Sequence, residues 1–413
     1  MQDTFSSASA AWSRMSAFRA DRARCKRYVY GEQWDDPIFD GRRMTTEREY
    51  ILRHGQIPLK NNILRRIIRN VTGLYRAQYR VPLLSPKESG LKGKALREVN
   101  DARRRWFHEN RMEEFAPRLL EEFLISGLVA VKVIGRDILP VTPDNFFFHS
   151  DGYDPRGRDV DMIGEVHQVS FGSLLERFCH SADDYRRISE IYGSSRRGAD
   201  TCRILEVWTK ETKVFTLQHD EEAARLRITP LPPSPCALEA SYAAQRDSSG
   251  LSGFLSLKPQ DLRVIPRTVW RSRWFSPDGT LLREGDPKEN HPYVYKAYPF
   301  IDGEVHSYIS DLIDQQRYVN RLITLYDFIM KASAKGVLLF PDDCLPAGMD
   351  LQDVADEWSR FNGVIPIRTK PGVPLPTQVS GNAANIGITE LLKIQMQMLE
   401  DISGVSPTLQ GKL

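Results

Sequence analysis

The stretch "ISDLIDQQRYVNRLITLYDFIMKASAKG", Ile309–Gly336, decides how the fold is interpreted, because its apolar residues recur every three or four positions. With the residues from Gly303 included, these apolar positions are Val305, Tyr308, Ile309, Leu312, Ile313, Val319, Leu322, Ile323, Tyr326, Ile329 and Met330. The spacing predicts one helix from Gly303 to about Ser333, which would span roughly 46 Å. Two polar residues, Gln316 and Asn320, fall inside its apolar face.

Composition indicates a soluble globular protein of two or three domains. The chain has 413 residues, of which 41% are hydrophobic and 27% are charged. The longest apolar run, Phe123–Ile134, is too short to span a bilayer and contains Lys132. The N-terminus has no apolar stretch typical of a secretory signal, so we expect no membrane association.

The net charge of +3, from 57 basic and 54 acidic residues, argues against a protein that grips DNA tightly along its whole length. Protein–DNA contacts that neutralise many phosphates are strong and salt-dependent. Near-neutrality is compatible with a protein that surrounds DNA and contacts it weakly.

No catalytic or metal-binding motif emerges from the sequence. The five cysteines are far apart, and the eight histidines form no H-x-x-x-H pair, so we predict reduced thiols, no metal and no cofactor. "GLKGKA" (Gly90–Ala95) lacks the spacing of a phosphate-binding loop. Acidic pairs such as Asp35–Asp36 and Asp342–Asp343 leave a magnesium-dependent DNA-processing enzyme as an alternative, although turns favour aspartate.

A basic helix is predicted near the N-terminal quarter. "LKNNILRRIIRNVTGLYRAQYR" (Leu59–Arg80) has one apolar face, and from Lys60 to Arg80 it contains no acidic residue. Its charged side is either a solvated face or a basic patch directed at phosphates or at an acidic neighbouring subunit.

The middle of the chain predicts a β-rich insert between helices. Ser170–Gly193 has a helical pattern with Ser170 at its N-cap. Residues Thr201–Pro299 alternate in the manner of strands, with "SPDG" as a hairpin turn and Pro230–Gly253 as an exposed loop. After the long helix, Pro371–Asn385 predicts a glycine- and proline-rich loop, followed by a helix that starts near Ile388.

Six segments occur in the order found in one protein family. They are "YVYGEQWDD" (Tyr28–Asp36), Pro58–Pro86, "LLEEFLISGLVAVKV" (Leu119–Val133), Val141–Ser170, Tyr298–Asp327 and "EDISGVSPTLQG" (Glu400–Gly411). Together, and with a β insert between two helices, the chain resembles the portal protein of tailed bacteriophages, the head-to-tail connector.

The resemblance implies an α+β fold, a mainly helical portal fold with long stem helices, a mixed α/β wing and a small β-rich clip. On this basis residues 1–169 would be wing, 170–200 a stem helix, 201–299 the clip and 300–335 a second stem helix. Residues 336–413 would continue the wing, with a tunnel loop at about 368–387 and the start of a C-terminal helix. The crown of the family would be absent or truncated.

The resemblance also implies partners. The chain would form a homo-oligomeric ring, a dodecamer, at the capsid vertex of the virion, after assembly in the bacterial host cytoplasm. Its partners would be double-stranded DNA without sequence specificity, the large terminase subunit, major capsid and scaffold proteins, and head-completion or tail adaptor proteins. It would be no enzyme. Another phage head or tail adaptor ring is the nearer alternative, and the magnesium-dependent enzyme the more distant one.

The same resemblance assigns site residues. Arg368, Lys370, Gln378 and Asn382 would line the DNA channel, and Gln316 and Asn320 would lie at a subunit contact. A buried amide without a partner costs about 1–3 kcal/mol, which hydrogen bonds between subunits would remove. In the alternative, a monomeric enzyme, Gln316 would instead bond to a backbone group of its own chain.

Overall fold

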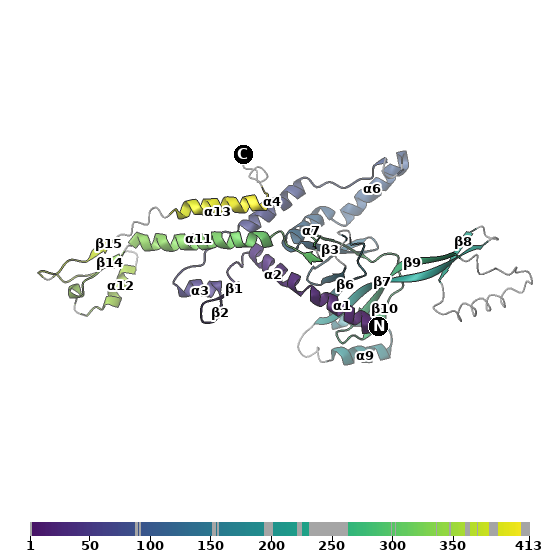
Figure 1. Cartoon of the computed structure of the whole chain (residues 1–413), viewed down its shortest axis with the longest axis horizontal. Coiled ribbons are helices and arrows are strands. Elements are labelled where there is room, and N and C mark those ends of the chain that lie inside the picture. The colour runs from purple at the N-terminus through teal and green to yellow at the C-terminus, as the bar shows by residue number, and fades with distance from the viewer. Residues whose placement is uncertain are drawn as a thin grey trace, which may run out of the picture. The chain divides into compact units, whose positions relative to one another are not determined.

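The computed structural model describes residues 2–405, apart from residues 87–89, 91, 151–153, 155–156, 194–200, 221–224, 231–262, 299, 302, 336, 347, 360–363, 370 and 380–386 (Figure 1). The chain divides into two compact units. Unit 1 comprises Met1–Arg24 and Gln78–Tyr308, and unit 2 comprises Cys25–Ala77 and Ile309–Leu413. Within the described residues, no helix is both long and apolar enough to cross a lipid bilayer. The predicted α+β class is confirmed.

Unit 1 is built on two antiparallel sheets. The larger has the order β10–β9–β7–β6–β5, with β8 also paired to β7. Its strands are β5 Phe146–His149, β6 Met162–Ser170, β7 Thr201–Asp220, β8 Arg225–Pro230, β9 Arg263–Phe275 and β10 Leu281–Glu284. The smaller sheet has the order β11–β3–β4, from β3 Leu128–Ile134, β4 Asp137–Val141 and β11 Tyr293–Ala297. A short pair, β12 Phe300–Ile301 and β13 Glu304–Val305, follows.

Apolar side chains of the two sheets form the main core of unit 1. Leu128 and Ala130 of the smaller sheet cluster with Phe146, Ile163 and Trp208 of the larger one. The neighbouring Phe147 is also fully buried, but in a different cluster, with Ala8 and Ala11 of α1 (Gln2–Arg14). Phe146 and Phe147 thus both serve the core, each in its own cluster.

Further helices complete unit 1. Helices α6 (Gly93–Glu109) and α7 (Met112–Ser126) precede β3. Helix α7 ends at Gly127, where the backbone has φ 72°, and a Cβ placed there would lie 2.1 Å from the carbonyl oxygen of His306. Only glycine fits both demands, because an L-residue disfavours that φ and would clash. Helix α2 (Ser16–Tyr30) begins in unit 1 and ends in unit 2.

The segment Ser170–Gly193 differs from its prediction as one helix. Ser170 caps its start, as expected, by accepting a hydrogen bond from the Ser173 amide. The helix stops at Phe178, however, and a second helix starts at Ala182, which gives α8 (Phe171–Phe178) and α9 (Ala182–Tyr192). Ser181 is the cause, because its hydroxyl caps α9 through the Asp184 amide, 3.1 Å away.

The strands of Thr201–Pro299 also differ from their prediction as a separate insert. Strand β7 pairs with β6 over nine residues, Ser170↔Thr201 to Met162↔Thr209, so the segment continues the sheet that precedes it. The "SPDG" turn is confirmed as the connection of β9 and β10, where Ser276 and Thr280 bond through their backbones. Of the predicted exposed loop, residues 231–253 lie outside the described residues.

Unit 2 is mainly helical. Its elements are the hairpin β1 Pro37–Phe39 and β2 Met44–Thr46, α3 Glu47–Arg53, α4 Ile63–Ala77, α11 Ser310–Lys335, β14 Val337–Leu339, α12 Leu351–Ser359, β15 Thr377–Val379 and α13 Ile388–Ser403. The predicted long helix is confirmed as α11, with 26 residues, but it begins at Ser310 because Glu304–Val305 is strand. The final helix starts at Ile388, as predicted.

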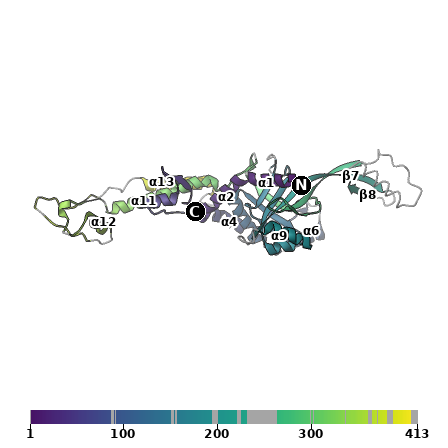
Figure 2. The ribbon, with the colours of Figure 1, turned by 90° about the horizontal axis from the view of Figure 1, so that it is seen from below.

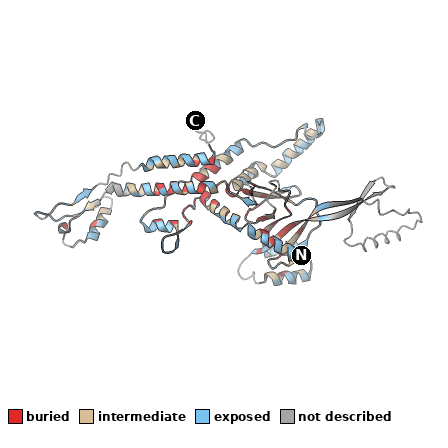
Figure 3. Ribbon diagram, viewed as in Figure 1, coloured by how far each residue is buried: buried red, intermediate tan, exposed pale blue. Residues whose placement is uncertain are grey.

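Helices α11 and α13 lie side by side and run in opposite directions (Figures 1 and 2). The segment between them contains β14, α12 and β15, and β14 pairs with β15. In Figure 3 the buried residues of α11 lie between Leu312 and Thr324, whereas α13 buries only Leu399 and Ser403 and is otherwise exposed or half-buried. The pair thus forms an arm whose start is packed and whose end carries a small α/β element.

Candidate functional site

Gln316 and Asn320 are fully buried in unit 2, and the structure gives both of them partners within the chain. Gln316 Oε1 accepts hydrogen bonds from the backbone amides of Ile63 at 3.0 Å and Leu64 at 3.3 Å. These amides open α4, and the first amides of a helix have no partner inside it. Gln316 Nε2 donates to the Asn61 carbonyl at 2.7 Å and to Asn320 Oδ1 at 3.0 Å. Gln316 therefore caps α4 from outside.

The polar stripe of α11 extends beyond these two residues. Asn320 Oδ1 accepts from the Asn61 amide at 3.1 Å, and Asn320 Nδ2 donates to Gln33 Oε1 at 2.7 Å. One turn further on, Thr324 Oγ1 accepts from the Leu59 amide at 3.1 Å. The stripe thus holds the extended stretch before α4 through its backbone groups.

Sequence reasoning found only part of this network. The spacing of four between Gln316 and Asn320 continues to Thr324, which is the signal that could have added the third residue. Gln33 and Asn61 lie more than 250 residues away in sequence and carry no such signal. The backbone partner of Gln316 is the arrangement named in the alternative to a subunit contact, and the subunit contact itself stays a prediction.

The predicted channel residues lie in the segment between α11 and α13. Arg368 is exposed, and its backbone amide bonds to the Cys344 carbonyl at 3.0 Å. Gln378 is exposed on β15, opposite Leu338 of β14. The predicted loop therefore contains a strand. Lys370 and Asn382 lie outside the described residues.

Charge is unevenly distributed within unit 2. Residues 60–77 contain five basic residues and no acid, namely Lys60, Arg65, Arg66, Arg69 and Arg76. Residues 342–357 contain six acids and no lysine or arginine, namely Asp342, Asp343, Asp350, Asp353, Asp356 and Glu357. The basic helix α4 adjoins α13 through an ion pair of 2.8 Å between Arg66 and Glu400.

Unit 1 contains a buried charged cluster that sequence reasoning missed. Glu165 lies directly opposite Glu206 on neighbouring strands, and His167 lies two residues after Glu165 on the same face of β6. Lys132 donates to Glu206 Oε2, and His167 Nε2 lies 2.7 Å from the same oxygen. Trp208 donates to the other oxygen of Glu206 at 2.9 Å. The E-x-H pattern of a strand was the available signal, because alternate residues share a face.

Three of these side chains have the composition of a metal site. One ligand atom each of Glu165, His167 and Glu206 lies within 4.8 Å of the others. The Lys132 ammonium, however, bonds to the Glu206 oxygen that also faces His167. The lysine supplies the positive charge that a cation would bring, so the set fits an internal ion-pair cluster better than a metal centre.

The environment shifts the pKa values of this cluster in opposite directions. Burial by itself would raise the pKa of Glu206, but hydrogen bonds from His167 and Lys132, with their charges, lower it to about 2. Burial raises the pKa of Glu165, against the charges of His167 and Lys132. Burial and the two carboxylates also raise the pKa of Tyr293 well above its usual value. Glu206 is therefore the anchored anion that pairs with Lys132.

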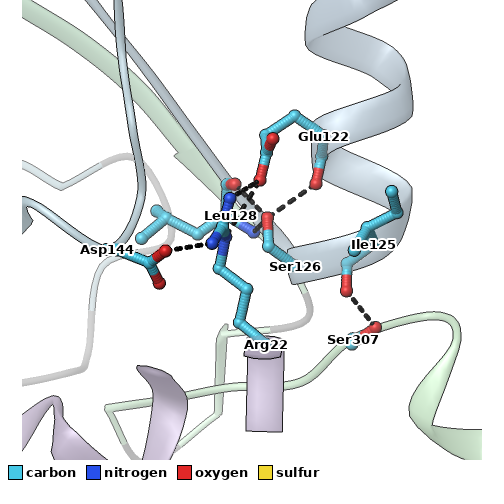
Figure 4. Close-up of polar contacts among 7 residues, drawn as sticks. All are labelled: Arg22, Glu122, Ile125, Ser126, Leu128, Asp144 and Ser307. Carbon is cyan, nitrogen blue, oxygen red and sulfur yellow. Dashed lines mark hydrogen bonds and ion pairs between the residues drawn. The ribbon is translucent and has the colours of Figure 1, made fainter. Parts of the chain in front are cut away.

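A second polar node of unit 1 surrounds Arg22 (Figure 4). The buried guanidinium bonds to Glu122 of α7 at 2.6 and 2.9 Å and to Asp144. Ser126, at the end of the same helix, bonds to the Glu122 carbonyl, and the Ser307 hydroxyl donates to the Ile125 carbonyl at 2.6 Å. These contacts fix α2 and α7 against the turn before β5, which is a structural role.

The buried polar networks of both units hold helices and strands in place, which is a structural role. Comparison with known proteins indicates a structural protein as well. No curated protein sequence matches the chain. The family model for phage P22-like portal proteins matches residues 6–412, nearly the whole length. That family is structural and non-enzymatic, and its members are components of the capsid vertex. The chain therefore belongs to the phage P22-like portal protein family.

Proposed function

We propose that this chain forms a closed ring at one vertex of a phage capsid, and that double-stranded DNA passes through the ring during packaging and ejection. The match to the portal family over residues 6–412 carries this proposal. In this role the ring docks the large terminase subunit during packaging and head-completion or tail adaptor proteins afterwards. Major capsid and scaffold proteins surround it in the assembling shell.

The α11–α13 arm supports a new assignment of stem and clip. The family resemblance calls for two helices that flank a small insert. Helices α11 and α13 lie antiparallel, and the segment between them holds the paired strands β14 and β15 and the helix α12. The earlier candidates fit less well, since Ser170–Gly193 is broken into two helices and β7 and β9 belong to the large sheet of unit 1. On this assignment α11 and α13 are the stem helices and residues 336–387 are the clip.

Within this segment, four residues are proposed to line the DNA channel, namely Arg368, Lys370, Gln378 and Asn382. Arg368 and Gln378 are exposed and therefore accessible to a ligand. Two basic residues per subunit, repeated around a ring, give weak contacts with phosphates rather than a tight clamp. Such contacts let DNA slide.

A cysteine at Gln378 tests the channel role. In filled heads, a crosslinker attached to the Gln378→Cys variant should capture packaged DNA. The control is Val294→Cys, at an exposed position of β11 in unit 1, which should capture none. Labelling of Gln378→Cys from outside filled heads without DNA capture would remove this segment from the channel.

Negative-stain electron microscopy of the purified chain tests the ring directly. The proposal predicts particles of uniform diameter with a central opening and a fixed rotational symmetry. Complementation of a portal-deficient phage by the same chain should restore DNA-filled heads. Particles without an opening, together with failed complementation, would contradict the proposal.

A further inference from the structure

The hairpin of β1 and β2 is packed at its root and exposed at its turn. At the root, directly after β2, the buried Glu47 carboxylate pairs with Arg317 and Arg321 of α11. At the turn, Phe39 and Met44 lie directly opposite each other and therefore share a face. They are 67% and 64% exposed, among the largest values for apolar side chains in the described part of the chain. Figure 1 shows the turn well away from α11. The hairpin is thus fixed where it meets the helix and open where it turns.

The turn itself has a fixed shape. Asp40 Oδ1 accepts hydrogen bonds from the backbone amides of Arg42 at 2.9 Å and Arg43 at 3.0 Å. The other oxygen of Asp40 pairs with Arg53 of α3 at 3.1 Å. Gly41 has φ 89°, in the left-handed region that favours glycine. These contacts hold the backbone of the turn, and the side chains of Arg42 and Arg43 remain exposed.

The two arginines of the turn carry positive charge that the chain does not neutralise. Within the residues that the structure describes, neither the Arg42 nor the Arg43 guanidinium has an ion pair or a hydrogen bond. The carboxylates around them do not supply one, because each carboxylate of residues 35–53 pairs with another base. These pairs are Asp35–Arg48, Asp36–Arg27, Asp40–Arg53, Glu49–Arg53, and Glu47 with Arg317 and Arg321.

The size and chemistry of the exposed turn fit a groove of duplex DNA. Two paired strands lie about 4.8 Å apart, and the major groove of B-DNA, about 12 Å wide, admits such a two-stranded ribbon. Unpaired guanidinium groups bind phosphate oxygens, and apolar side chains contact the thymine methyl group in this groove. A stable protein interface buries roughly 800 Å² on each partner, which two apolar side chains on a narrow turn do not provide.

We propose that the hairpin of residues 37–46 inserts its turn into the major groove of duplex DNA. Arg42 and Arg43 bind phosphates on the groove edges, and Phe39 and Met44 lie against base edges. The inference rests on the proposed function, in which DNA is the macromolecule that the ring handles, and it adds a contact outside the segment proposed to line the channel. Phosphate contacts carry no sequence information, so binding should differ little between duplexes.

The salt dependence of DNA binding tests the phosphate contacts. Binding of a short fluorescent duplex to the purified full chain is followed by anisotropy at a series of potassium chloride concentrations. Each phosphate contact contributes about 0.9 to the slope of log affinity against log salt concentration. The Arg42→Gln/Arg43→Gln variant should therefore bind more weakly, with a slope smaller by roughly 2 or more. The control Arg177→Gln/Arg186→Gln removes the same charge from exposed positions of α8 and α9 and should keep the wild-type slope.

A second variant tests the apolar contact. Phe39→Ser should bind DNA several-fold more weakly with the wild-type slope, because the side chain that is lost carries no charge. Circular dichroism should match the wild type for every variant, since all of the replaced side chains are exposed. Wild-type affinity in Phe39→Ser would overturn the insertion into the groove.

The remaining outcomes decide against other partners of the hairpin. A wild-type slope in Arg42→Gln/Arg43→Gln would overturn the contact with DNA. If that variant instead lost binding to phosphatidylglycerol vesicles, the turn would contact a membrane, and if it lost ring assembly, a neighbouring subunit. Electron microscopy of the same preparations separates this inference from the proposed function. Rings with an unchanged slope in the variant would overturn the hairpin contact alone, whereas a wild-type chain without rings would overturn the ring and leave the hairpin contact to be decided by the slope.

Discussion

Unit 1 and unit 2 differ in how completely one chain buries its large apolar side chains. Of the 29 large apolar residues that are exposed among the described residues, seven lie in unit 1 and 22 in unit 2, although unit 2 is the smaller. Unit 1 packs two sheets and their covering helices against each other. Unit 2 holds its apolar residues on long helices and short hairpins that a single chain covers only in part. Large exposed apolar surfaces mark sites of association, so unit 2 is the part of the molecule that we expect to be completed by other subunits.

Both units bury paired charges, and unit 2 also buries neutral amides. Unit 1 pairs Lys132 with Glu206, and unit 2 pairs the buried Glu47 with Arg317 and Arg321. In addition, unit 2 buries the amides of Gln316 and Asn320 against backbone groups. A buried charge that loses its partner is more costly than a buried amide that loses one. The comparison therefore predicts larger mutational effects, and acid sensitivity, at the buried ion pairs than at the buried amides.

The largest effect is expected for Lys132→Met. The substitution leaves the Glu206 carboxylate buried without its ammonium partner, and breaking such a pair costs roughly 3–5 kcal/mol. Urea unfolding followed by tryptophan fluorescence measures the loss. Lys296→Met, on the exposed side of β11, should change the stability by less than about 0.5 kcal/mol. Equal stability of the two variants would show that the cluster contributes nothing.

Helix α11 has one leucine at a buried position and one at an exposed position, so the stability effects of replacing each can be compared. Leu312 is buried, so Leu312→Ala should destabilise the dissociated subunit by roughly 2–5 kcal/mol. Leu325 is exposed in the single chain, so Leu325→Ala should change that stability by less than about 0.5 kcal/mol and weaken ring assembly instead. Unfolding of dissociated subunits and light scattering of assembled ones separate the two effects. A large loss of subunit stability in Leu325→Ala would contradict the contrast between the two positions.

The charged cluster should make unit 1 sensitive to acid. An ordinary glutamate has a pKa of 4.5, and in the folded chain that of Glu206 is lowered to about 2. As the pH falls, the unfolded chain binds this proton first, so stability present above pH 4.5 is lost between pH 4.5 and 2, by about 3 kcal/mol. Burial raises the pKa of Glu165 above 4.5, so Glu165 acts in the opposite sense above that pH. Denaturation across this pH range should show a flatter profile for Glu206→Gln, while the exposed Glu289→Gln should follow the wild type.

Gln316→Leu should destabilise the chain less than Lys132→Met does. It leaves the amides of Ile63 and Leu64 and the Asn61 carbonyl without their side-chain partner, at a cost of about 1–3 kcal/mol. The variant should stay folded, with faster hydrogen exchange in the first turn of α4. Gln397→Leu on α13 is the control and should leave both stability and exchange unchanged. Unchanged exchange at Ile63 and Leu64 in Gln316→Leu would contradict the capping role.

The spacing of apolar residues made the helices predictable from the sequence. Contacts between residues far apart in the sequence could not be predicted in this way. The three- and four-residue spacing identified α4, α11 and α13, with α13 starting at the predicted residue. The break between α8 and α9 arises because the Ser181 hydroxyl accepts a hydrogen bond from the Asp184 amide and so starts a new helix. The apolar spacing continues across this break and therefore did not reveal it. Strand β7 pairs with β6, and this pairing brings Glu206 opposite Glu165. Neither strand's own sequence indicates which other strand it will pair with.

The same limit applies to the candidate sites. Gln316 and Asn320 stood out because they interrupt an apolar face, but their partners Asn61 and Gln33 are polar residues in unremarkable surroundings. The second half of α11 was part of the predicted helix, yet only the structure shows that Leu325 and Phe328 are left uncovered while Leu312 is not. Whether an apolar residue is exposed depends on how the whole chain packs, and sequence periodicity alone does not predict it.

The most direct test of the claim that unit 2 is completed by other copies is the size and shape of the purified wild-type chain at micromolar concentration. Native mass spectrometry combined with electron microscopy measures both in one preparation. The account predicts one closed ring of identical copies with a central opening, in which Leu325, Tyr326, Phe328 and Met330 lie between subunits. A uniform population of single 413-residue chains, with these side chains open to solvent, would contradict it.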